Sequence, residues 1–280
     1  MPIDLHCHTK VSDGSVGVDE IIFIAKRMGI KSIAITDHDT FAGAKRGIVI
    51  GNRYGVDIVL AAEFSSFCKE LNKEIHILCY MCDYPDRLEG ICLFNSKARK
   101  ETNLKIVDDL MQVYPISHSL VSSRARGSSC IFKNHIVQAV IDSGYVLPIY
   151  SLVYKKIFSD SSKNICPQFC EPSEVILKIH QAGGVAIMAH PRETDINDVI
   201  PYLIGLEIDG IEVYHPSISI EYRSNLLKVA KRYGIITIGG SDFHGMYSTG
   251  ARPLNLFTTS DDELKLMIER KNIILRRYNG

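Results

Sequence analysis

The chain has 280 residues, enough for one large α/β domain or two smaller ones, and 46% of them are hydrophobic, which is ample for a buried core. Lys and Arg total 32, as do Asp and Glu, so the formal net charge is zero. The charge balance therefore gives no reason to expect a polyanionic partner such as a long nucleic acid. The apolar runs are strand-sized and the N-terminus resembles no signal peptide, so we expect a cytoplasmic protein without a membrane span.

Strand and helix patterns alternate in the first third of the chain. A short strand at Ile3–Leu5 is followed by an amphipathic helix at Val18–Met28, in which apolar residues recur at helical spacing. The next predicted elements are strand Ser32–Ile35, a helix from about Phe41 to Tyr54, strands Asp57–Ala62 and Ile75–Tyr80, and a helix from about Asp86 to Val113. A polar hairpin at Lys69–Lys73 separates the last two strands.

The alternation resumes after a long break. The predicted elements are helix Pro172–Gln181, strand Gly184–Ala189, helix Asn197–Leu203, strand Gly210–Tyr214, helix Ile220–Tyr233, strand Ile235–Gly239, the strand-like Asn255–Thr258, helix Asp261–Glu269 and a final apolar segment Ile273–Leu275. Repeated βα units predict a parallel sheet, and roughly seven of them closing on themselves predict an α/β barrel related to the (β/α)8 type.

Residues from about 100 to 170 interrupt this rhythm. Asn134–Ser143 predicts a short helix and Pro148–Phe158 another, and no strand pattern is clear. We therefore expect a barrel built from residues 1–99 and 168–280, with a small helical insertion, residues 100–167, over its mouth, where it could select substrate. The alternative is a peripheral decoration with no part in catalysis.

Metal-binding residue types stand at or just beyond the ends of successive predicted strands. They are His6, His8, Asp13, His38, Glu63, His76, His190, Asp242 and His244. Imidazole and carboxylate are ligands of Zn²⁺, Mn²⁺ and Fe²⁺, and folds of this type place their sites at the C-terminal ends of strands. A single His-x-His often arises by chance, but chance seldom assembles such a set. Because one ion needs three or four ligands, we expect a cluster of two or three ions.

Eight cysteines are scattered along a chain that is too long for a disulfide scaffold. Cys79-Tyr80-Met81-Cys82 has the spacing of a metal or redox motif, and Cys166 with Cys170 could complete a four-thiolate zinc site. Nothing in the sequence ties the two pairs together, so we expect free, reduced thiols.

Several motifs together resemble the PHP (polymerase and histidinol phosphatase) superfamily. They are His6-Cys7-His8, Ser12-Asp13-Gly14, Thr36-Asp37-His38-Asp39, the strand end at Glu63, Ala189-His190-Pro191 and Gly240-Ser241-Asp242-Phe243-His244-Gly245. The resemblance covers almost the whole chain. It is strongest to stand-alone bacterial members with a helical insertion, among them 3′,5′-nucleoside bisphosphate phosphatases and RNA 5′-end exonucleases. It implies a distorted (β/α)7 TIM-like barrel with a trinuclear metal site.

The resemblance also implies how the ligands are shared among the ions. His6, His8, Glu63 and Asp242 would bind one ion, Glu63 would bridge to a second ion held by His76 and His190, and Asp13, His38 and His244 would hold the third. Asp37 and Asp39 could orient neighbouring imidazoles as hydrogen-bond acceptors.

Relatives in this superfamily often carry Gly-Arg-Pro-His before a helix, where this chain has Phe132-Lys133-Asn134-His135. Lysine cannot make the planar two-bond contact that arginine makes with phosphate, so this departure bears on specificity for a bisphosphate. We expect Lys133, His135 and Arg192 to bind a phosphate or the nucleotide portion of the substrate, away from the reacting centre.

These features predict a metal-dependent phosphoesterase for phosphate monoesters, with 3′,5′-nucleoside bisphosphates or nucleoside monophosphates as the expected substrates. Divalent Mn²⁺, Fe²⁺ or Zn²⁺ would neutralise the phosphate, and metal-bound hydroxide would attack phosphorus in line with the ester oxygen. His190 or His244 could protonate the leaving oxygen if not fully occupied as ligands. The alternatives are a 5′-3′ exonuclease on short RNA or DNA ends, a histidinol-phosphate phosphatase, and a metal-binding module without catalysis.

Overall fold

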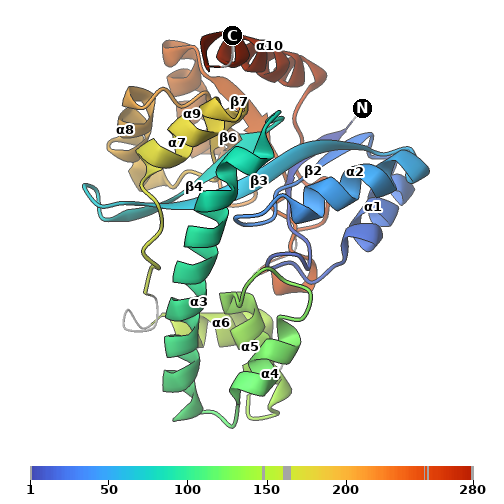
Figure 1. Cartoon of the computed structure of the whole chain (residues 1–280), viewed down its shortest axis with the longest axis vertical. Helices are drawn as coiled ribbons and strands as arrows, with labels where there is room; N and C mark the ends of the chain where they lie inside the picture. Colours follow the sequence, from blue (N-terminus) through green and yellow to red (C-terminus); the bar gives the residue numbers. More distant parts are fainter. Residues whose placement is uncertain (1, 147–148, 160–164, 249, 251, 279–280) are drawn as a thin grey trace.

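The computed structural model describes residues 2–146, 149–159, 165–248, 250 and 252–278. At its centre lies a seven-stranded sheet whose strands follow one another in chain order (Figure 1). The strands are β1 (Ile3–Cys7), β2 (Ser32–Ile35), β3 (Asp57–Cys68), β4 (Lys73–Tyr80), β5 (Val185–Met188), β6 (Gly210–Tyr214) and β7 (Ile236–Gly239). The α/β class predicted from the sequence is confirmed.

The sheet is mixed, so the prediction of a parallel sheet was wrong. β1, β2 and β3 are parallel to one another, as are β5, β6 and β7, but β4 runs antiparallel to both of its neighbours. The reason is the connection between β3 and β4. Only the tight hairpin Lys69–Asn72 joins these strands, whereas parallel strands need a crossover of a dozen or more residues.

The chain beyond β7 returns to the side of β1. Cys7 forms a parallel bridge with Phe243, and the N–H of His8 donates to the carbonyl oxygen of Phe243 at 2.8 Å. The N–H of Asp242 donates to the carbonyl oxygen of His6, also at 2.8 Å. These backbone contacts bring two predicted ligand motifs from opposite ends of the chain side by side.

The helices that accompany the sheet are α1 (Val18–Arg27), α2 (Ala42–Tyr54), α7 (Pro172–Gln181), α8 (Val199–Gly205), α9 (Ile220–Tyr233) and α10 (Asp261–Tyr278), and short 3-10 helices lie at Pro85–Leu88, Glu193–Ile196 and Gly245–Tyr247. Two predictions near the C-terminus were wrong. Asn255–Thr258 is not a strand, and Ile273–Leu275 belongs to α10. Met267 and Ile274 are buried two turns apart on α10, so its inner face continues past the predicted end of the helix.

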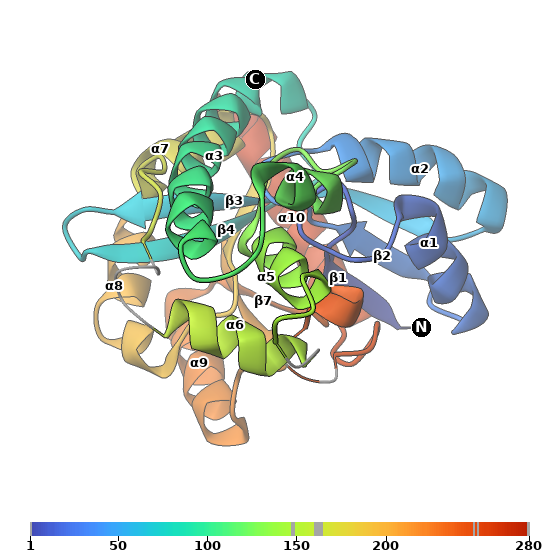
Figure 2. The same cartoon turned by 90° about the horizontal axis from the view of Figure 1, so that it is seen from below.

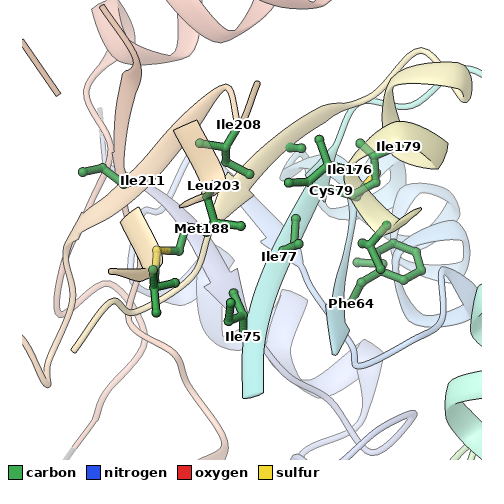
Figure 3. Packing of buried hydrophobic residues seen from close by; sticks show 14 of the residues in the cluster. Phe64, Ile75, Ile77, Cys79, Ile176, Ile179, Met188, Leu203, Ile208 and Ile211 are labelled. Carbon is green, nitrogen blue, oxygen red and sulfur yellow. The ribbon is translucent and has the colours of Figure 1, made fainter. Parts of the chain in front are cut away.

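Side chains of β3 and β4 alternate between two hydrophobic clusters, as expected for strands covered on both faces. Phe64, Ile77 and Cys79 lie on the side of α7, where they pack in one cluster with Ile176 and Ile179 (Figure 3). The opposite cluster contains alternate residues of the same strands, such as Ala61 and Leu78, together with side chains of β1, β2, β5 and β7. Glu63 and His76 are each two residues from a member of this second cluster, so they share its face of the sheet.

A third hydrophobic cluster lies in the helical segment, by which we mean the described part of residues 100–167. The long helix α3 (Glu89–Met111) contributes Ile91 to the cluster beside the sheet, and Ile106 and Leu110 to a cluster with α4 (His118–Arg124), α5 (Lys133–Asp142) and α6 (Tyr150–Phe158). Figure 1 shows these three helices at the far end of α3, and Figure 2 shows them in front of the sheet when the molecule is seen from below. In residues 100–146, 149–159 and 165–167, the described part of the predicted insertion, there are helices and no strand.

The eight cysteines are free, as predicted. Within the described residues, no group of cysteines is placed to hold a metal ion, which excludes the four-thiolate zinc site for this arrangement. Among the helices that the structure describes, none is both long and apolar enough to cross a membrane.

Candidate metal centre

The nine predicted ligands converge on one centre. They form overlapping groups in which one ligand atom of each residue lies within 4.8 Å of the others: His8, Asp13, His38 and His244; His6, Glu63 and His190; His6, His8 and Asp242; His38, Glu63 and His76. They come from β1, β3 and β4 and from the segments that follow β1, β2, β5 and β7. Their convergence agrees with the sequence pattern, and their assignment as metal ligands stays a prediction.

Glu63 lies in the middle of this cluster and is only 1% exposed. Its Oε1 is 2.8 Å from Nδ1 of His76 and 3.0 Å from Nε2 of His190. Its Oε2 is 3.0 Å from Nε2 of His8 and 3.2 Å from Nε2 of His6. The two oxygens thus face different histidines, which is the arrangement needed by a carboxylate that bridges two cations.

Asp13 and Asp242 complete the cluster. Oδ1 of Asp13 is 3.3 Å from Nε2 of His244 and 3.5 Å from Nδ1 of His8, and its Oδ2 is 3.8 Å from Nε2 of His38. Oδ1 of Asp242 is 3.4 Å from Nδ1 of His244. Because the groups overlap, the distribution of ligands among three ions also stays a prediction.

Two of these residues have a backbone conformation that few residues other than glycine adopt. The φ angle is 26° at His190 and 49° at Asp242, in or near the left-handed region. Such conformations are kept where the surroundings enforce them, and they cluster at functional sites. Here a hydrogen bond enforces each one: the N–H of His190 donates to Oε2 of Glu212 at 2.8 Å, and the N–H of Asp242 donates to the carbonyl oxygen of His6.

The carboxylates of the cluster stabilise positive charge on the histidines beside them. Burial would lower the pKa of His76, but the charges of Glu63 and Glu74 outweigh it and raise the pKa to about 10. Burial likewise opposes protonation of His244, and the charge of Asp13 helps to raise its pKa to about 9. A cluster that binds metal cations must have this electrostatic property.

His38 supplies a second indication that the residues present fit metal ions. Its Nδ1 is buried, lies 3.5 Å from Oε2 of Glu63 and makes no hydrogen bond with any described residue. A buried polar atom without a partner is costly, and coordination of a cation would satisfy it. Imidazole and carboxylate donors in these numbers suit Mn²⁺, Fe²⁺ or Zn²⁺.

Glu212, in the middle of β6, and His215, directly after it, support the cluster and were missed in the sequence. Glu212 is fully buried and its Oε1 accepts from Nδ1 of His6 at 3.0 Å, which leaves Nε2 of His6 to face the centre. His215 accepts the N–H of Ser217 on its Nδ1, so its Nε2 carries the proton, and this Nε2 lies 3.2 Å from Oδ2 of Asp242. His215 directly follows the predicted strand Gly210–Tyr214, so the strand-end rule could have found it.

Asp37 and Asp39 make no hydrogen bond with a histidine among the described residues, contrary to our prediction. Asp37 accepts from the N–H of Thr9 at 2.8 Å and from the hydroxyl of Ser12 at 2.6 Å, and Asp39 accepts from the guanidinium of Arg99. Both carboxylates therefore fix the segments around the ligands and leave the imidazoles to other partners.

A cavity of about 360 Å³ lies beside the cluster. Its lining includes Asp13, His38, His76 and His190 from the cluster and the cationic side chains of Arg99, Lys133 and Arg192. The guanidinium of Arg99 lies between the rings of Phe132 and Phe169, 4.7 Å from each centroid. The cavity thus combines candidate metal ligands with three cationic side chains, beside the acidic Glu74 and Asp195, and the cationic side chains suit an anionic ligand.

Two of the three predicted substrate contacts line this cavity. Lys133 begins α5, and burial lowers its pKa, while Arg192 is exposed. His135 does not line the cavity: it is 2% exposed, its Nδ1 accepts the N–H of Phe132 at 3.1 Å, and burial lowers its pKa to about 4. The prediction that His135 binds substrate therefore has no support from its position.

Comparison with known proteins shows which family this site resembles. Residues 4–130, which contain six of the nine cluster residues, match the family model described as PHP domain. Residues 4–130 are therefore similar to a PHP domain. The resemblance read from the strand-end motifs is thereby confirmed.

Relatives of this chain are named as hydrolases of phosphate esters. A phosphoribosyl 1,2-cyclic phosphate 1,2-diphosphodiesterase of Eggerthella lenta is 28% identical over 249 residues, covering 87% of this chain and 94% of the relative. A 5′-3′ exoribonuclease of Haemophilus influenzae is 24% identical, covering 86% and 89%. A 3′,5′-nucleoside bisphosphate phosphatase of Chromobacterium violaceum is 24% identical, covering 86% and 87%. The predicted enzyme class, a hydrolase, is confirmed.

The fold is shared along almost the whole chain. A solved structure from Bifidobacterium adolescentis, named as a candidate metal-dependent phosphoesterase, superposes with a TM-score of 0.85 at 26% identity. The superposition covers 96% of this chain and 98% of that one, so the helical segment has a counterpart within the shared architecture.

Proposed function

We propose that the chain hydrolyses phosphate monoesters of small nucleotides, with two or three divalent metal ions as cofactors. The observation that carries this proposal is the convergence of nine imidazole and carboxylate side chains around Glu63, beside a cavity with three cationic residues. A cavity of about 360 Å³ falls at the lower end of the range for small-molecule sites. The relatives named above support phosphate ester chemistry.

The residues of the cluster would hold the ions, with Glu63 between two of them. When bound, such ions neutralise phosphate charge and lower the pKa of a coordinated water towards 7. Glu212 fixes the ring of His6 through Nδ1, and Glu74 lies 3.1 Å from Nε2 of His76, so each ring turns its other nitrogen toward Glu63. These carboxylates hold the imidazoles in orientation and increase their basicity.

We assign substrate binding to the cationic side chains that line the cavity. We assign to Lys133 and Arg192 the contact with a second phosphate or another anionic group, and to the cluster the reacting phosphate; that both residues line the cavity supports this. Of the two histidines considered as proton donors to the leaving oxygen, His190 lines the cavity and His244 does not. A nitrogen that coordinates an ion carries no proton, so we assign this proton transfer to His190 only in a state in which it does not bind an ion.

The domain organisation that we propose has two parts. Residues 1–99 and 168–280 form a distorted seven-stranded barrel, and residues 100–167 form the helical insertion. The backbone bonds between β1 and the segment after β7 support closure of the sheet. The separate hydrophobic cluster of α4, α5 and α6 supports the insertion, although α3 crosses the boundary between the two parts.

A second candidate is hydrolysis of a cyclic phosphodiester on ribose, because the relative from Eggerthella lenta is named for that reaction and shares 28% identity. Action on the 5′ ends of short RNA is a third, on the evidence of the exoribonuclease. Both reactions use the same cluster, and they differ in what the cavity must hold next to the reacting phosphate.

A substrate screen separates these candidates. Purified protein is stripped with chelator, reloaded with Mn²⁺ and offered 3′,5′-nucleoside bisphosphates, nucleoside 5′-monophosphates, a ribose 1,2-cyclic phosphate, histidinol phosphate and 5′-phosphorylated oligonucleotides. We expect the highest kcat/KM on a nucleotide monoester, with Glu63→Gln as the inactive control. Preference for the cyclic diester or for oligonucleotides would replace our proposal with the corresponding candidate.

A further inference from the structure

The helical segment is bonded to the loop that carries Asp13. The hydroxyl of Ser128 donates to the carbonyl oxygen of Ser12 at 2.6 Å, and the N–H of Ser129 donates to the carbonyl oxygen of Val11 at 2.8 Å. Both bonds are made by the stretch just before α5. They attach the segment to one particular loop, the loop that follows β1.

Asn134 makes the contact that reaches the cluster itself. It is 8% exposed, and its Nδ2 donates to the carbonyl oxygen of Asp13 at 2.8 Å and to Oδ2 of Asp13 at 3.1 Å. Its Oδ1 accepts from the hydroxyl of Tyr150 in α6 at 2.7 Å. Both atoms of Asp13 can only accept, so the amide nitrogen must face them and the orientation of Asn134 is fixed.

Further contacts of the helical segment fall on the same group of ligands. Asp13 belongs to the group with His8, His38 and His244. Phe132 stacks on His38 with ring centroids 5.8 Å apart, and Tyr150 stacks on Tyr247, three residues after His244, at 5.7 Å. His38 is shared with the group of Glu63 and His76, whereas Asp13 and His244 belong to the first group alone. Glu63 and His76 lie on adjacent paired strands.

We infer that Asn134 is a positioning residue that holds the carboxylate of Asp13, so that the helical segment sets the affinity of one ion of the centre and leaves the others unaffected. This inference rests on the proposed metal centre. An amide that bonds both the backbone and the side chain of a ligand restricts its rotation. Outer residues of this kind typically contribute about tenfold to a hundredfold to metal affinity.

The test is a metal titration of three variants. Protein stripped with chelator is titrated with Mn²⁺ by calorimetry, and bound metal is counted after desalting. For Asn134→Ala, we expect one class of ion to bind about tenfold to a hundredfold more weakly and the remaining class to bind as in the wild type. Tyr150→Phe keeps its ring and loses only the hydroxyl, so we expect a smaller shift of the same class.

Gln138→Ala is the matched control, because it removes an amide of the same helix whose hydrogen bond goes to Asp142. It should bind Mn²⁺ as the wild type does. Thermal unfolding in chelator checks that each variant is folded, and Tyr150→Phe carries the test if Asn134→Ala is not.

The outcomes are distinct. Unchanged affinity in both Asn134→Ala and Tyr150→Phe would overturn the inference, as would an equal weakening of every ion in a folded variant. A wild-type protein that binds fewer than two ions would instead overturn the proposed metal centre.

Discussion

Glu63 and Asp13 are buried carboxylates of one cluster, but the structure holds them in different ways. Glu63 lies on β3, opposite Leu78 of β4, and its N–H donates to the carbonyl oxygen of Thr36 at 3.2 Å. Asp13 lies in a loop and takes hydrogen bonds from the helical segment. One carboxylate is therefore placed by strand pairing, and the other is held by the side chain of Asn134, which comes from far along the chain.

The loop itself shows how closely Asp13 is confined from the other side. Gly14 packs so tightly that an added Cβ would lie 2.5 Å from the carbonyl oxygen of His8. The N–H of Gly14 donates to the carbonyl oxygen of Thr9 at 2.9 Å, which closes the turn. The proposed centre therefore has two parts. The part around Glu63 is positioned by strand pairing, and the part around Asp13 depends on the helical segment, so the two parts should respond differently to mutation.

We expect the largest effect on activity from a mutation in the part around Glu63. Glu63→Gln removes the charge that faces histidines of two groups, so we expect loss of both metal binding and phosphate release, with activity reduced by about a thousandfold or more. Metal content and Mn²⁺-dependent phosphate release measure this. Glu70→Gln, the same substitution at an exposed hairpin residue, is the control. Near wild-type activity with native metal content in Glu63→Gln would show that our ligand assignment is wrong.

We expect a smaller effect on activity from a mutation in the part around Asp13. Asp13→Asn alters one group of ligands only, so we expect the loss of about one ion and a fall in activity of about tenfold to a hundredfold. Elemental analysis of the desalted variant, together with phosphate release at saturating Mn²⁺, gives both numbers. If Asp13→Asn lost every ion, as Glu63→Gln should, the two parts would not be separable.

Lys133 tests whether the helical segment acts on substrate as well as on metal. A charge-assisted phosphate contact contributes on the order of 1.5–3 kcal/mol, so Lys133→Ala should lower kcat/KM for the preferred nucleotide by about tenfold to a hundredfold. p-Nitrophenyl phosphate has no second group for Lys133 to bind, so its hydrolysis should barely change. Equal losses on both substrates would assign Lys133 to the metal centre or to folding. No loss on either would make the segment a decoration.

The smallest effect concerns stability. His135 accepts the N–H of Phe132 at the start of α5, so His135→Ala should lower the free energy of unfolding by about 1–3 kcal/mol at pH 7 and leave nucleotide selectivity unchanged. The pKa of His135 is lowered from its ordinary value of 6.5 to about 4. The unfolded chain therefore binds a proton more readily, and this contribution is lost as the pH falls from 6.5 towards 4.

Urea unfolding in chelator at pH 7 and pH 5 measures this effect. The difference between the wild type and His135→Ala should shrink at pH 5. If the variant instead kept its stability and changed substrate preference, His135 would contact substrate after all.

Much of the candidate site could be predicted from the sequence, because its residues obey a local rule. A candidate ligand at the end of a strand can be recognised from the apolar run before it, as at His190 after Val185–Met188. Strand direction could not be predicted in the same way. The alternation of strands and helices suggested parallel pairing throughout, but the short hairpin at Lys69–Asn72 makes β3 and β4 antiparallel.

The supporting residues were harder to predict, because their partners lie far away in the sequence. Asn134 stands where the resembled motif has proline, so the motif gave no reason to connect it with Asp13. Glu212 is an acidic residue inside a buried strand, which is a signal in itself, since an unpaired buried charge would be costly. Its partner, His6, becomes apparent only when the sheet is assembled.

The central claim is that the cluster around Glu63 is a metal centre on which hydrolysis depends. Elemental analysis of the wild-type protein, purified without chelator and assayed before and after metal removal, tests it most directly. We predict well over one transition-metal ion per chain, loss of phosphate release on removal, and recovery with Mn²⁺. A metal-free protein that hydrolyses phosphate esters at the full rate would contradict the account.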